Sequence, residues 1–233
     1  MEIMEIIKDA ALYPINNVKA LVIYAVLMIV AVLVLAISGV GLIGATDAAA
    51  LGILGIIGII IALAIFILIA GYMLDVIKMG INREDGAPEI DAKRQIINGI
   101  KFIILAIIYL IIPFIVMAIL SSINETLGLI VGLILCIIFA ILLVIAQCRF
   151  AKTESLGEGL NFSEVIGDLK EIGIVKVLAI IILVSIIAYI LSAIGTGISG
   201  ISETIGSIIT AILSIYVTFF QNRAYGLLYS DAE

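Results

Sequence analysis

The chain has 233 residues, of which 64% are hydrophobic and only 13% are charged, and its net charge is −6. A soluble domain has roughly a quarter of its residues charged, so this composition excludes a soluble fold and predicts an all-α, polytopic membrane protein. The chain has no histidine and only two cysteines, which argues against histidine-based catalysis and clustered metal sites. We therefore expect a protein that is not an enzyme, with no catalytic residues, no cofactor, no metal and no nucleic-acid partner.

Six apolar runs are long enough to cross the hydrocarbon core of a membrane, which is ~30 Å thick and needs about 20 helical residues. They lie at residues 20–43, 50–74, 102–120, 127–148, 177–196 and 205–222. None of the runs has a charged residue in its central part. Because coupled transporters and pumps usually need ionisable groups within the membrane, this pattern argues against coupled transport.

The basic residues predict how the chain is oriented. All 12 lysines and arginines flank the six runs on one side. The positive-inside rule assigns that side to the cytoplasm. We therefore expect a multi-pass protein of the cell membrane with both termini in the cytoplasm, together with the loops near 75–101 and 149–176.

Matching segments indicate that a unit of two spans occurs three times. Lys19, Lys101 and Lys176 each precede an odd-numbered span, and segment 123–128 (INETLG) resembles segment 201–206 (ISETIG). Each unit would contain an amphipathic helix on the cytoplasmic surface, a span, a tight outer turn and a returning span. The approximate units are residues 1–80, 81–152 and 153–233 of a single transmembrane domain.

The amphipathic pattern is clearest in the third unit. Its apolar residues recur at the spacing of one helix face: Phe162, Val165, Ile166, Leu169 and Ile172. A helix of this kind lies in the plane of the membrane surface. The second such helix is expected to begin at Pro88, because proline is favoured in the first helical turn.

Several short motifs resemble a known family. They are segment 71–74 (GYML) followed by Gly80, Asp85, Pro88 and Gly99, and segment 149–151 (RFA) followed by segments 156–157 (LG) and 160–165 (LNFSEV). In these motifs the chain is similar to the uncharacterised prokaryotic membrane family known as domain of unknown function 4013. The resemblance implies a six-span fold and no known activity, so no functional residue follows from it.

Each predicted outer turn has one acidic residue, and these are Asp47, Glu125 and Glu203. In a bundle with threefold symmetry, the three could form a carboxylate ring of the kind that collects cations. Alternatively, each acid stabilises the start of a helix beside a capping residue, which would be Thr46, Asn124 or Ser202.

Two returning spans end in the same Gln-x-Arg motif, formed by Gln147 and Arg149 and by Gln221 and Arg223. Arginine presents a planar fork of donors that matches phosphate oxygens. We therefore predict that these four residues contact lipid phosphates at the cytoplasmic surface. The alternative is that the arginines reach the headgroup region without a specific partner.

No motif indicates a biochemical role. We expect a non-catalytic scaffold, assembly partner or lipid-handling bundle, with membrane lipids and either another protein or a second copy of the chain as partners. The alternative is a channel or facilitator for a small solute or ion. Its uncharged path would be lined by polar side chains of the spans: Tyr109, Ser185, Tyr189, Ser192, Thr210, Ser214 and Tyr216.

Overall fold

The computed structural model describes the backbone of residues 1–43, 48–200 and 202–232, and the side chains of these residues outside 40–52. The described residues are helical and are joined by short turns and loops. Their helices are α1 (Ile3–Asn16), α2 (Val18–Ile43), α3 (Ala48–Ile81), α4 (Ala92–Ile123), α5 (Glu125–Thr153), α6 (Leu156–Gly159), α7 (Phe162–Ile172), α8 (Ile174–Ser199) and α9 (Glu203–Tyr229).

Six of these helices are long and apolar enough to cross a membrane: α2, α3, α4, α5, α8 and α9. This finding confirms the all-helical, six-span prediction. Several helices extend beyond the predicted apolar runs, as α3 continues to Ile81 and α4 already begins at Ala92. The extensions contain charged residues that pair with other helices, so the backbone stays helical where the sequence is no longer apolar.

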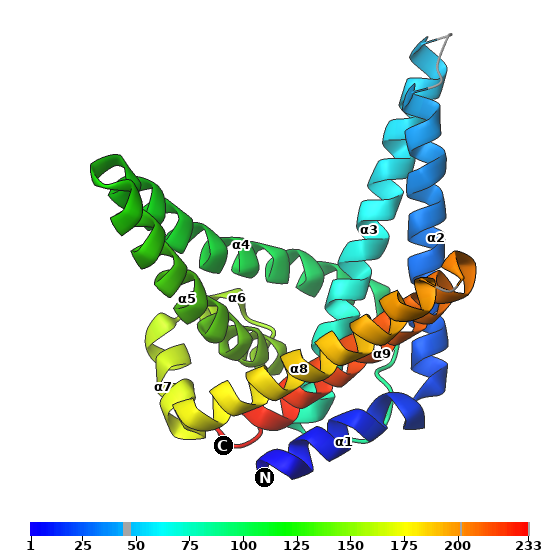
Figure 1. Ribbon diagram of the computed structural model, residues 1–233. Helices are drawn as coiled ribbons and strands as arrows, with labels where there is room; N and C mark the ends of the chain where they lie inside the picture. Colours follow the sequence, from blue (N-terminus) through cyan, green and yellow to red (C-terminus); the bar gives the residue numbers. More distant parts are fainter. Residues whose placement is uncertain (44–47, 201, 233) are drawn as a thin grey trace.

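The long helices form three hairpins, α2–α3, α4–α5 and α8–α9, which diverge from a common region (Figure 1). We call this region the base. It comprises α1, α6, α7, the loop 82–91 and the adjoining ends of the six long helices. Both ends of the chain lie in the base (Figure 1). Helices α3 and α9 are central, because α3 contacts α2, α4, α5 and α9, and α9 also contacts α1, α2, α5, α7 and α8.

The apolar core of the protein lies mainly toward the base. Its largest cluster joins buried residues of seven helices, including Ile6, Leu74, Leu105, Ile145, Val165, Ile180 and Leu227. Toward the hairpin tips the buried positions are mostly small, such as Ala31, Gly132 and Gly195, while large apolar side chains are exposed. Outside the base, each hairpin is therefore a two-helix arm with an apolar surface.

Glycines allow α3 to pack directly against the backbones of its neighbours. A Cβ atom added at Gly71 would lie 1.9 Å from the carbonyl oxygen of Gln95 on α4, and one added at Gly99 would lie 2.1 Å from that of Ile67. Helix α9 approaches α3 in the same way at Gly226, where an added Cβ would lie 2.2 Å from a backbone oxygen of α3. Such small residues are typical of close helix contacts in membranes.

The expected helix start at Pro88 is wrong. Asp91 caps α4 instead, because its side chain accepts a hydrogen bond from the Arg94 backbone N–H at 3.1 Å. Pro88 lies in the preceding loop, where its carbonyl oxygen accepts from the Tyr72 hydroxyl at 3.4 Å. From Ala92 the helix continues without a break into the span, whereas α1 and α7 are separate from the spans that follow them.

We expect Gly71→Ala to lower the temperature of unfolding, because the added methyl group overlaps the Gln95 carbonyl and forces α3 and α4 apart. Overpacking of this kind costs about 1–3 kcal/mol. Unfolding in detergent can be followed with a thiol-reactive dye that reaches Cys148, which is 1% exposed in the folded protein, in a Cys136→Ala background.

The matched control for this change is Gly167→Ala on α7, where an added Cβ meets nothing within 4 Å. This variant should unfold at the parental temperature or slightly above it, since alanine favours helix more than glycine does. Equal unfolding temperatures for the two variants would contradict the close packing of α3 and α4.

Candidate functional site at the base

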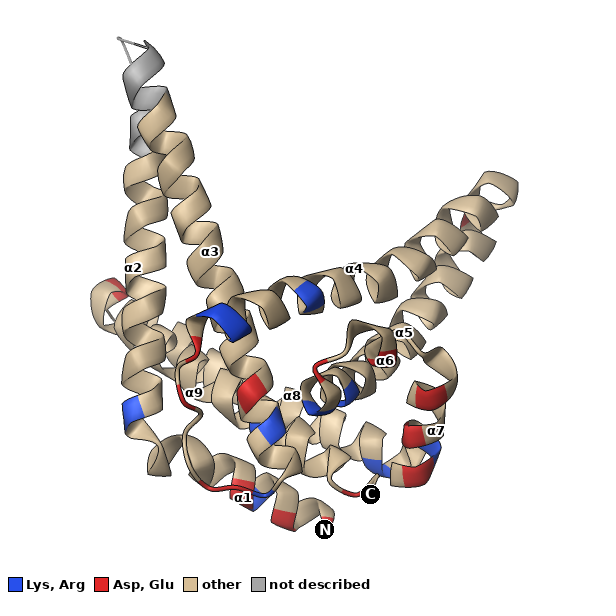
Figure 2. Cartoon of the chain, turned by 180° about the vertical axis from the view of Figure 1, so that it is seen from behind, with Lys and Arg blue, Asp and Glu red and all other residues tan. Residues whose placement is uncertain are grey.

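The charged residues of the described chain concentrate in the base, and the hairpin arms have few (Figure 2). Most of the arginines there form ion pairs with acids from another helix or loop. The base is thus a network of polar contacts beside an apolar core. In three of these contacts the central side chain is at most 16% exposed, and each contact joins one hairpin to the segment that leads into another.

The first contact centres on Arg223 of α9, whose side chain is 1% exposed. Its Nε donates to Asp9 of α1 at 2.8 Å, and one terminal nitrogen donates to Asp85 at 3.4 Å. The other terminal nitrogen donates to two backbone oxygens of segment 79–84, at 3.1 and 2.5 Å. The guanidinium also lies 4.7 Å from the ring centre of Tyr13. Each guanidinium nitrogen therefore has a partner within the protein.

The second contact centres on Arg149 of α5. One terminal nitrogen donates to both carboxylate oxygens of Asp168 on α7, at 3.1 and 3.0 Å. The other donates to Glu158 at 2.7 Å and to Glu164 at 3.3 Å. Asp168 also accepts from the Tyr229 hydroxyl at 2.6 Å. Arg149 thereby fastens the end of α5 to α6 and α7, and Asp168 adds the end of α9.

The third contact centres on Asp75 of α3, a buried acid. The two terminal nitrogens of Arg94 on α4 donate to its two oxygens at 2.7 and 2.9 Å. Gln95 adds a third hydrogen bond from its side-chain nitrogen, at 2.8 Å. This two-pronged geometry is the strong form of an arginine–carboxylate pair, and it fastens α3 to the start of α4.

The three contacts follow a common plan. Asp75, Arg149 and Arg223 are each separated by 74 residues, and each lies near the base end of the second helix of a hairpin. Each binds an opposite charge on the segment that introduces the next unit, and these partners are Arg94, Asp168 and Asp9, respectively. The third pair runs from the last hairpin back to α1. The hairpins are therefore linked in a closed ring.

A further polar centre forms at Glu154, which ends α5 in a left-handed conformation with φ of 53°. Its carboxylate accepts from Lys78 at 2.7 Å and from Arg94 at 3.3 Å, and its carbonyl oxygen accepts from Lys101 at 3.1 Å. The hydrogen bond from Lys78 is the main cause that lowers the pKa of the Glu154 carboxyl below its ordinary value of 4.5. Glu154 thus connects the ends of α3, α4 and α5.

Residues 56–200, more than half of the chain, match the family described as "Protein of unknown function (DUF4013)". The chain belongs to the DUF4013 family. This match confirms the resemblance inferred from the short motifs. No curated protein and no solved structure matches the chain. With its six membrane-crossing helices, this DUF4013 protein is a multi-pass membrane protein, and the family does not assign it a biochemical role.

In this DUF4013 protein the Gln-x-Arg motifs lie at the base, but their arginines bind carboxylates of the chain itself. To reach Arg223, a lipid phosphate would have to displace Asp9 and Asp85 from a buried guanidinium. Gln221 donates to the hydroxyl of Tyr225 on its own helix, at 3.0 Å, and Gln147 is half-buried. We therefore assign Arg149 and Arg223 to ion pairs within the protein.

Sequence reasoning missed Asp75 as the counterpart of these two arginines in the first unit. Its position was detectable, because the 74-residue spacing of Arg149 and Arg223 extends back to it. The sign of its charge is reversed, however, so a search for a third arginine finds nothing in the first unit. The pattern that identifies Asp75 is a charged residue of either sign at every 74th position.

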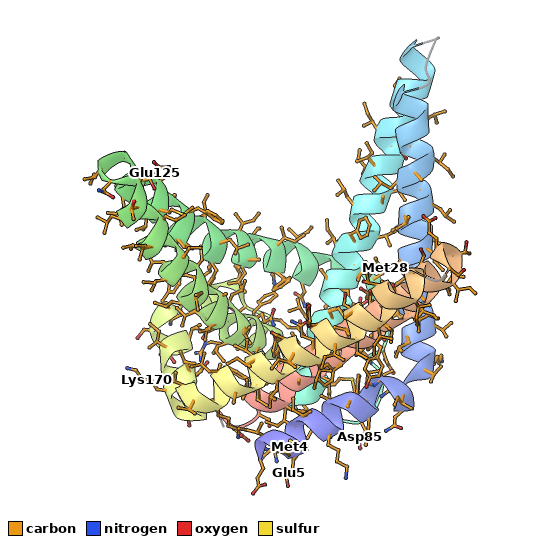
Figure 3. The ribbon with its side chains drawn as sticks, in the orientation of Figure 1. Met4, Glu5, Met28, Asp85, Glu125 and Lys170 are labelled. Atoms are coloured by element: carbon orange, nitrogen blue, oxygen red, sulfur yellow. The ribbon has the colours of Figure 1, made fainter. Side chains whose placement is uncertain are left out.

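The outer acids do not form a ring among the described residues. Asp47 lies outside the residues that the structure describes. Glu125 and Glu203 begin α5 and α9, which belong to diverging hairpins, and Figure 3 labels Glu125 at the tip of its hairpin. The capping interpretation is confirmed for Asn124, whose side chain accepts from a backbone N–H of α5 at 3.0 Å. At the start of α9, Ser202 is the N-cap residue and Glu203 lies in the first turn, but the Ser202 side chain makes no capping hydrogen bond.

The polar side chains proposed to line a path have separate roles. The hydroxyl of Tyr109 is buried and donates to the backbone of α6 at 2.9 Å, and that of Tyr216 donates to the backbone of α1 at 2.7 Å. Ser214 donates within its own helix, and Tyr189 is 74% exposed on α8. Within the described residues, no group of three or more acids and cysteines is arranged to hold a metal ion.

We expect Arg223→Met to destabilise the protein by about 3–5 kcal/mol, because it leaves Asp9 without its buried partner. Adding Asp9→Asn to this variant should restore part of the loss by removing the unpaired charge. The measurement is the unfolding temperature in detergent. Lys170→Met is the control, since Lys170 points outward from α7 (Figure 3) and exposed substitutions cost less than about 0.5 kcal/mol. Strictly additive effects of Asp9→Asn and Arg223→Met would show that the pair is not coupled.

We expect Glu154→Gln to destabilise the protein at neutral pH, with a deficit that shrinks in acid. The folded-state pKa of Glu154 is lowered, so its contribution is present above the unfolded-state pKa and is lost as the pH falls through the folded value, below 4.5. Unfolding temperatures of parent and variant should therefore converge between pH 7 and pH 3. The exposed Glu171→Gln should track the parent throughout. A deficit of Glu154→Gln that is independent of pH would contradict this role.

Proposed function

We propose that this DUF4013 protein is a non-catalytic membrane scaffold. Ion pairs in its base hold three hairpin units together, and the apolar arms present surfaces to membrane lipids and to the helices of another protein or of a second copy. The observation that carries the proposal is the exposure of the arms. Large apolar side chains such as Ile56, Ile60 and Ile115 are 50–60% exposed while the buried core lies toward the base.

The proposal includes a threefold repeat with units near residues 1–80, 81–152 and 153–233. It is supported by the ring of ion pairs, because the same position in each unit binds the segment that introduces the next. The separate helices α1 and α7 support it as well. Each buries an apolar side, with Ile6 and Ala10 on α1 and Val165 and Ile172 on α7, and exposes charged side chains such as Lys8 and Lys170. Helices of this kind suit the membrane surface.

The proposed orientation places the base and both termini in the cytoplasm. The lysines and arginines support it, because the positive-inside rule applies to residues near the ends of spans. The hairpin tips would then face the outer side. Among the residues with described side chains, the acids outside the base are Glu125 and Glu203 at two tips.

A scaffold agrees better with this geometry than the alternative of a channel or facilitator. In lipid, an exposed isoleucine has no tendency to be buried, so diverging apolar arms are stable without closing around a path. Three of the hydroxyl groups that would line a path, those of Tyr109, Ser214 and Tyr216, instead bond to backbone oxygens of the base or of their own helix. The central parts of the six apolar runs also lack the charged side chains that mark transport pathways.

The proposal is tested by cysteine labelling in cells, with both natural cysteines replaced by alanine. A charged, membrane-impermeant thiol reagent should label Ser122→Cys in intact cells and Ala87→Cys only after permeabilisation. It should not label Ser185→Cys or Ser214→Cys, which lie on the exposed surface of an arm, whereas a lipid-soluble reagent should label both. Labelling of Ser185→Cys or Ser214→Cys by the charged reagent would reveal a water-filled path and favour the channel.

A further inference from the structure

An open cavity of about 280 Å³ lies where α4 leaves the base, beside the ion pair of Arg94 and Asp75. Its walls are Asp91, Lys93, Arg94, Ile97, Asn98, Lys101 and Glu154. Lys93, Ile97 and Lys101 are spaced four residues apart and so lie along one side of α4. The cavity is therefore a basic site that opens beside the first turns of a membrane-crossing helix.

The acids around this cavity already have cationic partners. Asp75 binds both terminal nitrogens of Arg94, at 2.7 and 2.9 Å, and Asp91 lies 3.6 Å from the Nε of the same side chain. The carboxylate of Glu154 binds Lys78 at 2.7 Å. These three acids share two cations, Arg94 and Lys78. With Lys93 and Lys101, four cations stand against three acids around the cavity, so the site has a net positive charge.

Two lysines of the cavity bind no carboxylate among the described residues. Lys93 is exposed and has no acidic partner among the described residues. Lys101 donates to the backbone oxygen of Glu154 at 3.1 Å and to no carboxylate among those residues. The two lie about 12 Å apart along the helix axis, and their flexible four-carbon stems allow both ammonium groups to turn toward one anion above Ile97.

The surroundings of the lysines indicate what kind of anion this is. Beyond the cavity, α4 continues into the apolar arm with Ile97, Ile100 and Ile104 each 41–45% exposed. A ligand that fits both features has a phosphate group at the depth of the base and acyl chains along the arm. Free phosphate would satisfy the lysines alone and leave the isoleucines without contact.

We propose that an anionic phospholipid of the leaflet next to the base binds here, with its phosphate between Lys93 and Lys101 and its acyl chains along α4. This proposal adds a lipid-binding site to the proposed scaffold function. It depends on that function only for the position of the base at a membrane surface. It also moves the expected phosphate contact away from the Gln-x-Arg motifs, where the arginines bind internal carboxylates, to lysines that bind no carboxylate among the described residues.

The test uses the full chain in mild detergent and native mass spectrometry with added phosphatidylglycerol or phosphatidylcholine. The parent should retain phosphatidylglycerol in preference, and Lys93→Gln with Lys101→Gln should reduce the retained fraction at least fivefold. Lys8→Gln with Lys170→Gln is the matched control, because it removes the same charge from exposed positions on α1 and α7. Unfolding temperatures close to that of the parent would verify that both double variants are folded.

The other outcomes overturn the proposal. An equal loss in both double variants shows a general effect of charge, and an unchanged fraction in Lys93→Gln with Lys101→Gln shows that the lysines hold no lipid. If inorganic phosphate alone displaces phosphatidylglycerol from the parent, the site binds a free anion. None of these results alters the labelling pattern that tests the scaffold, so the two proposals fail separately.

Discussion

The burial of the Arg223 guanidinium is the constraint on which the closed arrangement of the hairpins depends. A buried cation is tolerated only when its donors are satisfied, and here the partners come from α1, from the last turn of α3 and from the loop that follows it. Asp9 and Arg223 are 214 residues apart in the sequence. Their contact turns a linear series of units into one body.

The membrane explains why polar contacts take this role in such an apolar chain. In water, exposed isoleucines would drive the hairpins together, but lipid tails are as apolar as the side chains, so this force is absent along the arms. What remains is close backbone packing, as at Gly71 and Gly226, and the ion pairs of the base. Where they join different hairpins, both occur near the base, and the arms diverge beyond it.

The sequence was sufficient to predict the spans, because length and apolar composition decide them locally. It also drew attention to Arg149 and Arg223 through their shared motif, but it could not supply their partners. Asp168 and Asp9 look like ordinary solvated charges on amphipathic helices until the fold brings them to an arginine. The predicted start of α4 was wrong for a local reason, since Pro88 and Asp91 are two alternative helix-start signals three residues apart.

The reversed sign of Asp75 helps to specify the order of the units around the ring. In the observed order, the charged residues 75, 149 and 223, which are 74 positions apart, bind opposite charges at residues 94, 168 and 9. In the opposite circular order, Asp75 would meet Asp168 and Arg223 would meet Arg94, so two of the three contacts would bring like charges together. Three identical pairs could not discriminate in this way. The single inversion therefore disfavours the wrong arrangement, which is how repulsive contacts commonly secure specificity.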